Sequence, residues 1–220
     1  MNELLLVISI IGVFSMLLIA KRLFGENGVI GWIGIASIMA NILITKSIDL
    51  IGFSATLGNV LFASNFLATD ILTENYGVES AKKGVKFGIF AVLFFLIVTQ
   101  TALLFVPNEL DIANESMMTL FSLTPRICLA SMVLFALSNI LDVRLYEYLR
   151  IKTNGKYMWF RNNVSTILCN GTENFIFYFI AFGGIFGIKE LLFMGATASI
   201  IEIIIALCDT PFLYLSKKIK

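Results

Sequence analysis

Long apolar stretches alternate with short polar segments along the whole chain. A helix needs about 20 mainly apolar residues to cross the hydrocarbon core of a bilayer. Stretches close to that length occur at residues 3–20, 28–46, 50–69, 85–106, 127–146, 163–186 and 191–212. The connections between them are too short to form a separate soluble domain. The pattern predicts an all-α, polytopic membrane helix bundle of about seven spans, in a single integral membrane domain over residues 1–220.

The stretch 50–69 is the weakest of these predicted spans, because glycine, serine, threonine and asparagine interrupt it. A continuous membrane helix is one interpretation. A re-entrant or discontinuous segment is the other, since membrane proteins tolerate irregular backbone where it lines a cavity.

The basic residues indicate an orientation. Connections on one side of the predicted bundle hold thirteen of the sixteen: Lys21, Arg22, Lys82, Lys83, Lys86, Arg144, Arg150, Lys152, Lys156, Arg161, Lys217, Lys218 and Lys220. The other side holds Lys46, Arg126 and Lys189. Cytoplasmic loops carry the excess of Lys and Arg. We therefore expect a cytoplasmic C-terminus and, with seven spans, an N-terminus outside.

Composition narrows the range of functions. Hydrophobic residues make up 58% of the chain and charged residues 14%, against about 25% charged in soluble domains. Histidine is absent, which removes imidazole bases and histidine metal ligands. The three cysteines are isolated, so they form no CxxC pair. A net charge of +1 offers no basic patch for nucleic acid. We expect no direct nucleic-acid partner, no metal and no cofactor, and the lipid bilayer as surroundings.

Two groups of polar residues lie near predicted span ends. Asp70 and Glu74 are four residues apart and share one helix face, where two carboxylates can hold a cation or accept paired N–H donors from a ligand. A solvated helix end is the structural alternative. Asn139 and Asp142 also share a face, and there the alternative is an Asp142–arginine ion pair.

A third group runs through the predicted span 163–186. As a helix, Asn162, Thr166, Asn170 and Glu173 form one polar stripe, with Ser165 beside it. Amides, hydroxyls and a carboxylate suit recognition of a small polar ligand. Hydrogen bonding between helices is the alternative, but a carboxylate deep in a span favours a functional role. Asp49, Glu202 and Asp209 are further acidic candidates without a supporting pattern.

Three motifs carry a family resemblance: LATDILTENYG at 67–77, SNILDVRLYEYLR at 138–150 and WFRNNVSTILCNGTENFIF at 159–177. Over residues 36–185 the chain resembles the queuosine precursor transporters, also called the vitamin uptake transporter family. The resemblance implies bacterial inner-membrane import of deazaguanine precursors for the tRNA modification queuosine. It implies a substrate-binding role for Asp70, Glu74, Tyr76, Asp142, Trp159, Arg161, Asn162, Asn163, Ser165 and Thr166. Glu173 occupies a place where this family is acidic, often with aspartate.

The resemblance leaves several points open. The substrate is a purine-like small molecule, cyano- or aminomethyl-deazaguanine or queuine. The family is similar in turn to the six-helix, substrate-binding membrane components of energy-coupling-factor vitamin transporters, which implies a six-helix core plus an N-terminal helix. A separate energising module is therefore a candidate partner, since the chain has no GxxxxGK[ST] motif of its own. Capture of another vitamin-like solute and, more remotely, an intramembrane aspartyl enzyme are the alternative functions.

Overall fold

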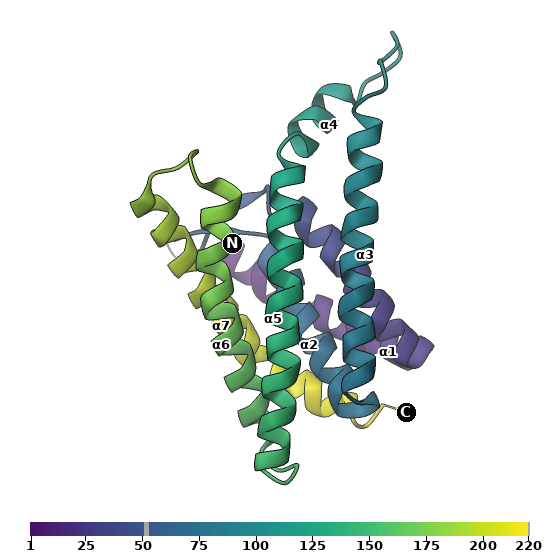
Figure 1. The fold of residues 1–220 in the computed structure, drawn as a ribbon, viewed down its shortest axis with the longest axis vertical. Coiled ribbons are helices and arrows are strands. Elements are labelled where there is room, and N and C mark those ends of the chain that lie inside the picture. Colours follow the sequence, from purple (N-terminus) through teal and green to yellow (C-terminus); the bar gives the residue numbers. More distant parts are fainter. Residues whose placement is uncertain (51–52, 220) are drawn as a thin grey trace.

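Helices form almost the entire chain, which confirms an all-α membrane protein. The computed structural model describes residues 1–50 and 53–219, with all of their side chains except those of 53–55, 166 and 170. The helices are α1 (Asn2–Leu43), α2 (Gly58–Tyr76), α3 (Val78–Ala102), α4 (Asn114–Phe121), α5 (Thr124–Lys152), α6 (Met158–Phe182) and α7 (Ile188–Ser216) (Figure 1). The number of spans and the side of the C-terminus stay predictions.

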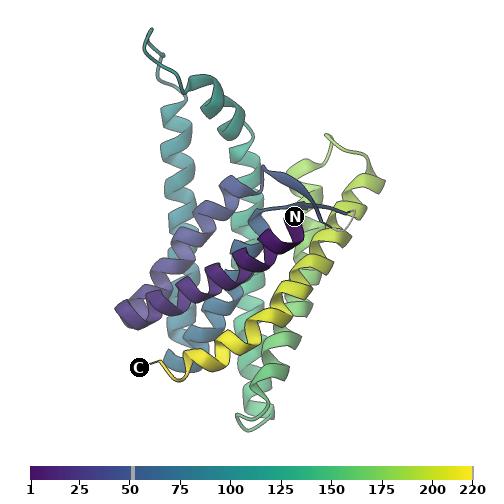
Figure 2. The ribbon, with the colours of Figure 1, turned by 180° about the vertical axis from the view of Figure 1, so that it is seen from behind.

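A sharp bend divides α1 into two arms that match the predicted spans 3–20 and 28–46. Gly25 has φ 60° and ψ −138°, a conformation open to glycine because it has no Cβ. Three residues later, a Cβ on Gly28 would lie 2.2 Å from the carbonyl oxygen of Ala20. The two arms therefore pass each other closely at the bend, and Figure 2 shows them diverging from it.

The predicted span 50–69 is wrong in its first part. Residues Ser47–Leu50 (β1) and Phe53–Thr56 (β2) form an antiparallel pair, in which Ser47 lies opposite Thr56; residues 51–52 lie outside the described part. Isoleucine and threonine are frequent in β-strands and serine is frequent in turns, so this segment does not continue the helix. Asn2 donates to the Asp49 carbonyl oxygen at 2.9 Å, which ties the start of α1 to the hairpin. The helix α2 begins only at Gly58.

The centre of the bundle is α2. Every residue from Ala63 to Thr73 is buried, because α1, α3, α5 and α7 all pack against this helix. Figures 1 and 2 show α2 between a face formed by α3 and α5 and a face formed by α1 and α7. A helix covered on all sides keeps its polar groups away from lipid. The polar residues of α2 therefore lie inside the protein.

Four segments are long and apolar enough to cross a membrane: Asn2–Leu43, Val78–Ala102, Asn114–Lys152 and Ile188–Ser216. Within the described residues, α2 and α6 do not reach this hydropathy. These two helices carry most of the candidate site residues. The apolar helices thus shield two more polar ones, as expected where a polar site is enclosed by a membrane bundle.

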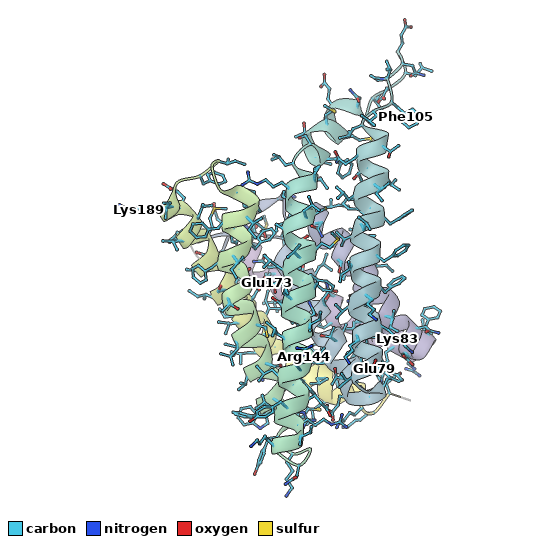
Figure 3. All side chains as sticks on the ribbon, viewed as in Figure 1. Glu79, Lys83, Phe105, Arg144, Glu173 and Lys189 are labelled. Carbon is cyan, nitrogen blue, oxygen red and sulfur yellow. The ribbon has the colours of Figure 1, made fainter. Side chains whose placement is uncertain are left out.

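Labelled side chains distinguish the two ends of the bundle. Figure 3 shows Lys83 and Arg144 toward one end and Phe105 and Lys189 toward the other. The C-terminus lies at the end of Lys83 and Arg144 (Figure 1). We call this the basic end, and the end of Phe105 and Lys189 the opposite end.

Candidate functional site

Glu74 forms hydrogen bonds and ion pairs with side chains from three neighbouring segments. Arg161 of α6 donates from Nη2 to Glu74 Oε2 at 2.5 Å, and the Tyr146 hydroxyl of α5 donates to the same oxygen at 3.1 Å. Lys217, just after α7, pairs with Oε1. The Glu74 side chain is 4% exposed. A solvated helix end therefore does not describe Glu74, which instead joins four helices near the basic end.

Arg161 is buried against three groups, and only its Nε has no hydrogen-bond partner in the described structure. It is fully buried, its guanidinium lies 5.2 Å from the centre of the Tyr146 ring, and its Nη1 donates to the Lys156 carbonyl oxygen at 3.1 Å. A buried guanidinium is stable only when it is paired and hydrogen-bonded. The Glu74 carboxylate supplies that pairing.

Three aspartates from three helices interact with one another, and Asp70 connects them to this ion pair. Asp70 (α2), Asp142 (α5) and Asp209 (α7) have no exposed surface, and each interacts electrostatically with at least one of the others. We call them the aspartate triad. Neither oxygen of Asp70 or of Asp142 has a hydrogen-bond partner among the described residues. Ser165 lies beside Asp142 but outside hydrogen-bond geometry.

The predicted Asp142–arginine ion pair is not present in the described part of the chain. Arg161 is bound by Glu74, and Arg150 pairs with Glu147 at 3.3 Å. Asn139, on the same face as Asp142, is buried and donates to the Phe135 carbonyl oxygen at 2.9 Å. Asp142 therefore lies in the interior as a carboxyl group without a cation bound to it.

The two asparagines that follow Arg161 connect α6 to α7. Asn162 donates from Nδ2 to Asp209 Oδ1 at 2.6 Å. Asn163 donates to the Trp159 carbonyl oxygen at 2.7 Å and to Thr210 Oγ1 at 2.9 Å. Ser165 is buried and donates to the Asn162 carbonyl oxygen at 3.3 Å. The bonds from Asn162 and Asn163 to α7 are the hydrogen bonding between helices that asparagine commonly provides in membranes.

Further from the basic end, Glu173 (α6) and Glu202 (α7) border a small cavity, here called the glutamate cavity. Asn174 donates to Glu202 Oε2 at 2.7 Å, and Glu173 Oε2 has no hydrogen-bond partner in the described structure. The remaining lining is mostly aromatic: Phe62, Phe66, Phe135, Phe177 and Tyr178, with Ile44, Asn59 and Ser131. The cavity volume is ≈ 20 Å³, room for about one water molecule.

Glu173 links this cavity to the aspartate triad. It interacts electrostatically with Asp142 on one side and with Glu202 on the other. At a rise of 1.5 Å per residue, Glu173 lies about 18 Å along α6 from Arg161. Figure 3 shows it midway between the two ends of the bundle. Buried acids therefore form a continuous series from the cavity to the basic end.

Not all of the sequence-predicted site residues come together. Asp70, Glu74, Asn139, Asp142, Arg161, Asn162, Asn163 and Ser165 lie in the basic half of the bundle, and Glu173 lies at the cavity. Tyr76 is 38% exposed at the end of α2, and Trp159 is 52% exposed at the start of α6. The side chains of Thr166 and Asn170 lie outside the described residues.

Asp209 and Glu202 are the acids whose position the sequence patterns did not show. They are seven residues apart and therefore lie on one face of α7, two turns from each other. Two acids at this spacing in an otherwise apolar span are a usable signal. The aromatic lining of the cavity carries no such signal, since phenylalanine is frequent in every span.

Comparison with known proteins identifies the family. The family model described as "Putative vitamin uptake transporter" matches residues 56–216. The "Probable queuosine precursor transporter" of Bacillus subtilis (strain 168) is 36% identical over 206 residues, which cover 93% of this chain and 90% of that protein. The "Queuosine precursor transporter" of Escherichia coli (strain K12) is 27% identical over 65% of this chain and 62% of its own length.

A third relative, the "Probable queuosine precursor transporter" of Haemophilus influenzae (strain ATCC 51907 / DSM 11121 / KW20 / Rd), is 30% identical over 59% of this chain and 53% of that protein. No solved structure matches the chain. The resemblance inferred from the three motifs is confirmed. The chain belongs to the vitamin uptake transporter family and is a multi-pass protein of the bacterial plasma membrane.

Proposed function

We propose that this protein imports queuosine precursors, namely cyano- or aminomethyl-deazaguanine or queuine, for tRNA modification. The names of its relatives support this function. The observation that carries it here is the glutamate cavity, which combines two carboxyl groups and two amides with five aromatic side chains inside the bundle.

The chemistry of the cavity suits a deazaguanine. A guanine-like edge presents adjacent N–H donors, which one carboxylate can accept together. Glu173 has an oxygen without a partner for this role. A flat bicycle stacks on aromatic rings, an interaction worth about 1–3 kcal/mol per base. Glu202, held by Asn174, supplies a second acid for a cationic aminomethyl group.

The proposed site would have to enlarge before it could take up its solute. A volume of ≈ 20 Å³ cannot hold a bicyclic base. Loading therefore requires movement of the aromatic side chains or of the helices that carry them. A site that closes around its solute suits an importer, because the binding site must never be open to both sides of the membrane at once.

We further infer that the basic end faces the cytoplasm, with seven spans in one domain over residues 1–220. The positive-inside rule supports this orientation, as does the gathering of Lys83, Arg144 and the C-terminus at one end (Figures 1 and 3). Asp70, Glu74, Asp142 and the Asn162–Ser165 segment would then adjoin the cytoplasmic exit.

The test is uptake in a bacterial strain that can neither make nor import queuosine precursors. The strain expresses the chain, receives each base in turn, and its tRNA is assayed for queuosine by mass spectrometry. We expect rescue by at least one base. Absence of rescue by every base, with the protein shown to be inserted, would overturn the function.

Two variants locate the site. Glu173→Gln keeps the size of the side chain but replaces one acceptor oxygen with a donor. Charge-assisted hydrogen bonds contribute about 1.5–3 kcal/mol, so uptake should require a roughly ten- to hundredfold higher precursor concentration. Glu190→Gln, at an exposed position near the opposite end, is the matched control and should behave as wild type. Normal uptake by the Glu173 variant would place the binding site elsewhere.

A further inference from the structure

The aspartate triad lies between the glutamate cavity and the basic end. Its three acids form no ion pair with a basic residue in the described structure. We propose that Asp70, Asp142 and Asp209 form a proton-binding site that couples solute import to proton entry. The inference rests on the proposed import function and adds its energy source.

A count of charges in the interior supports the proposal. The connected acids are Glu202, Glu173, Asp142, Asp209, Asp70 and Glu74. Arg161 and Lys217 are the bases in contact with them in the described structure, and both bind Glu74. Removing an isolated carboxylate from water costs several kcal/mol. Five further acids therefore need another source of positive charge.

Protons supply that charge most simply. A proton neutralises a buried carboxyl group without further ligands, whereas a metal ion needs several oxygen atoms around it. The described residues contain no group of three acidic or sulfur ligands with the geometry to hold a metal ion. Neighbouring acids also share protons readily, because two like charges at close range disfavour each other.

A buried amide oxygen without a partner lies beside the triad and supports the same ligand. Asn162 has no exposed surface, and its Nδ2 lies on Asp209 at 2.6 Å while its Oδ1 has no partner in the described structure. An amide oxygen accepts a hydrogen bond from a protonated carboxyl group but not from a carboxylate. Asn162 can therefore donate from Nδ2 to the Asp209 carboxylate and, after its amide turns over, accept at Oδ1 from the protonated carboxyl group.

The charged and titratable residues that surround Asp70 lie on several helices. Glu74 lies on α2 itself, Asp142 and Tyr146 on α5, Arg161 on α6 and Asp209 on α7. On α1, Lys21 is directed to carbonyl groups at the end of α7. The ionisable residues of α3, namely Glu79, Lys82, Lys83 and Lys86, are exposed.

Glu173 provides the coupling between proton and solute. It borders the cavity and also interacts electrostatically with Asp142. A solute that engages Glu173 changes the charge that the triad experiences, and a proton on Asp142 changes the charge that the solute meets. Coupling between two sites is reciprocal in this way.

The experiment uses the purified full-length protein in liposomes that contain a pH-sensitive dye. Exchange of labelled for unlabelled base, at equal pH on both sides, reports binding and transport without a driving force. Uptake driven by an imposed inward proton gradient, with dye fluorescence recorded in parallel, reports coupling. At one proton per neutral base, a gradient of one pH unit should accumulate the base about tenfold.

Asp142→Asn is the decisive variant, because it removes the titration and keeps the shape. We expect it to lose accumulation and base-dependent proton entry, while Asp142→Glu restores part of both. Glu147→Gln, on the same helix and outside the acid series, is the control and should accumulate as wild type. The infrared band of protonated carboxyl groups, which is independent of transport, should be smaller in Asp142→Asn than in wild type.

The outcomes separate the two proposals. Exchange in wild type without any effect of the pH gradient, or accumulation driven by a sodium gradient at equal pH, would overturn proton coupling and leave the import function intact. Unchanged accumulation and an unchanged infrared band in Asp142→Asn would do the same. Absence of exchange of every base would overturn the import function, and proton coupling with it.

Discussion

Glu74 binds more partners than any other carboxylate of the described structure. One oxygen accepts from Arg161 and Tyr146, and the other pairs with Lys217. Although Asp70 and Glu74 share one face of α2, their surroundings differ, since Asp70 has no hydrogen-bond partner among the described residues. Glu74 therefore serves to hold α5, α6 and α7 against α2, and Asp70 is the one with oxygens free for a ligand.

Replacement of Glu74 should destabilise the protein strongly. In Glu74→Gln the Arg161 guanidinium stays buried without its counter-charge, and breaking a buried ion pair from one side costs about 3–5 kcal/mol. We expect a clear fall in the melting temperature of the detergent-purified protein. The control is Glu79→Gln, which removes an exposed pair with Lys82 and should leave the melting temperature close to that of wild type, because exposed ion pairs contribute little to stability. Equal melting of both variants would contradict a clamping role for Glu74.

For single residues, the sequence identifies the candidate site residues better than it identifies the partners that they contact. Asp70, Asp142 and Glu173 stand out because charges inside apolar spans are costly, and the structure does bury Asp70 and Asp142 completely. The pairing of Arg161 with Glu74 and of Asn162 with Asp209 joins residues 87 and 47 apart in sequence. No helical period relates such distant positions, so only the packing of the helices reveals these contacts.

At the scale of elements, hydropathy locates the helices because each apolar span must be long enough to cross the lipid. It fails between residues 47 and 57, where a short hairpin has the same average polarity as an interrupted helix. It also gives no sign of α4 (Asn114–Phe121), since eight residues at the surface carry no burial pattern. Boundaries therefore depend on local hydrogen bonding, which average hydropathy does not record.

Lys21 secures the end of α7. It is 4% exposed and donates to the carbonyl oxygens of Ser216 at 2.5 Å and of Ile219 at 2.9 Å. The last carbonyl groups of a helix have no partner within the helix, and a cation near them also interacts favourably with the helix dipole. One arm of α1 thereby holds the segment that also carries Lys217.

Lys21→Met should therefore loosen the C-terminal turn of α7. We expect faster hydrogen exchange over residues 213–219 and a loss of about 1–2 kcal/mol of stability. Arg22→Met changes the exposed neighbouring side chain and should leave exchange in that segment as it is in wild type. Similar exchange in both variants would show that packing alone, without Lys21, holds the end of α7.

For the whole molecule, the proposed orientation can be read with single cysteines. After Cys128, Cys169 and Cys208 are replaced by alanine, one cysteine is placed at Lys83 or at Lys189, near opposite ends of the bundle (Figure 3). Because basic loops stay in the cytoplasm, a membrane-impermeant maleimide should label Lys189→Cys on intact spheroplasts and Lys83→Cys only after lysis. The reverse pattern would invert the orientation and place the basic end outside.

The contacts of Lys21 with α7 also have a consequence for biogenesis. The ribosome completes the bend of α1 long before it reaches Ser216, so Lys21 and Glu74 both wait for partners that are synthesised after the other helices. Until α7 is made, Lys21 and the Oε1 atom of Glu74 lack these partners. Both charges therefore acquire these partners only when the last helix docks, which makes that step the one that completes the ion pairing of the bundle.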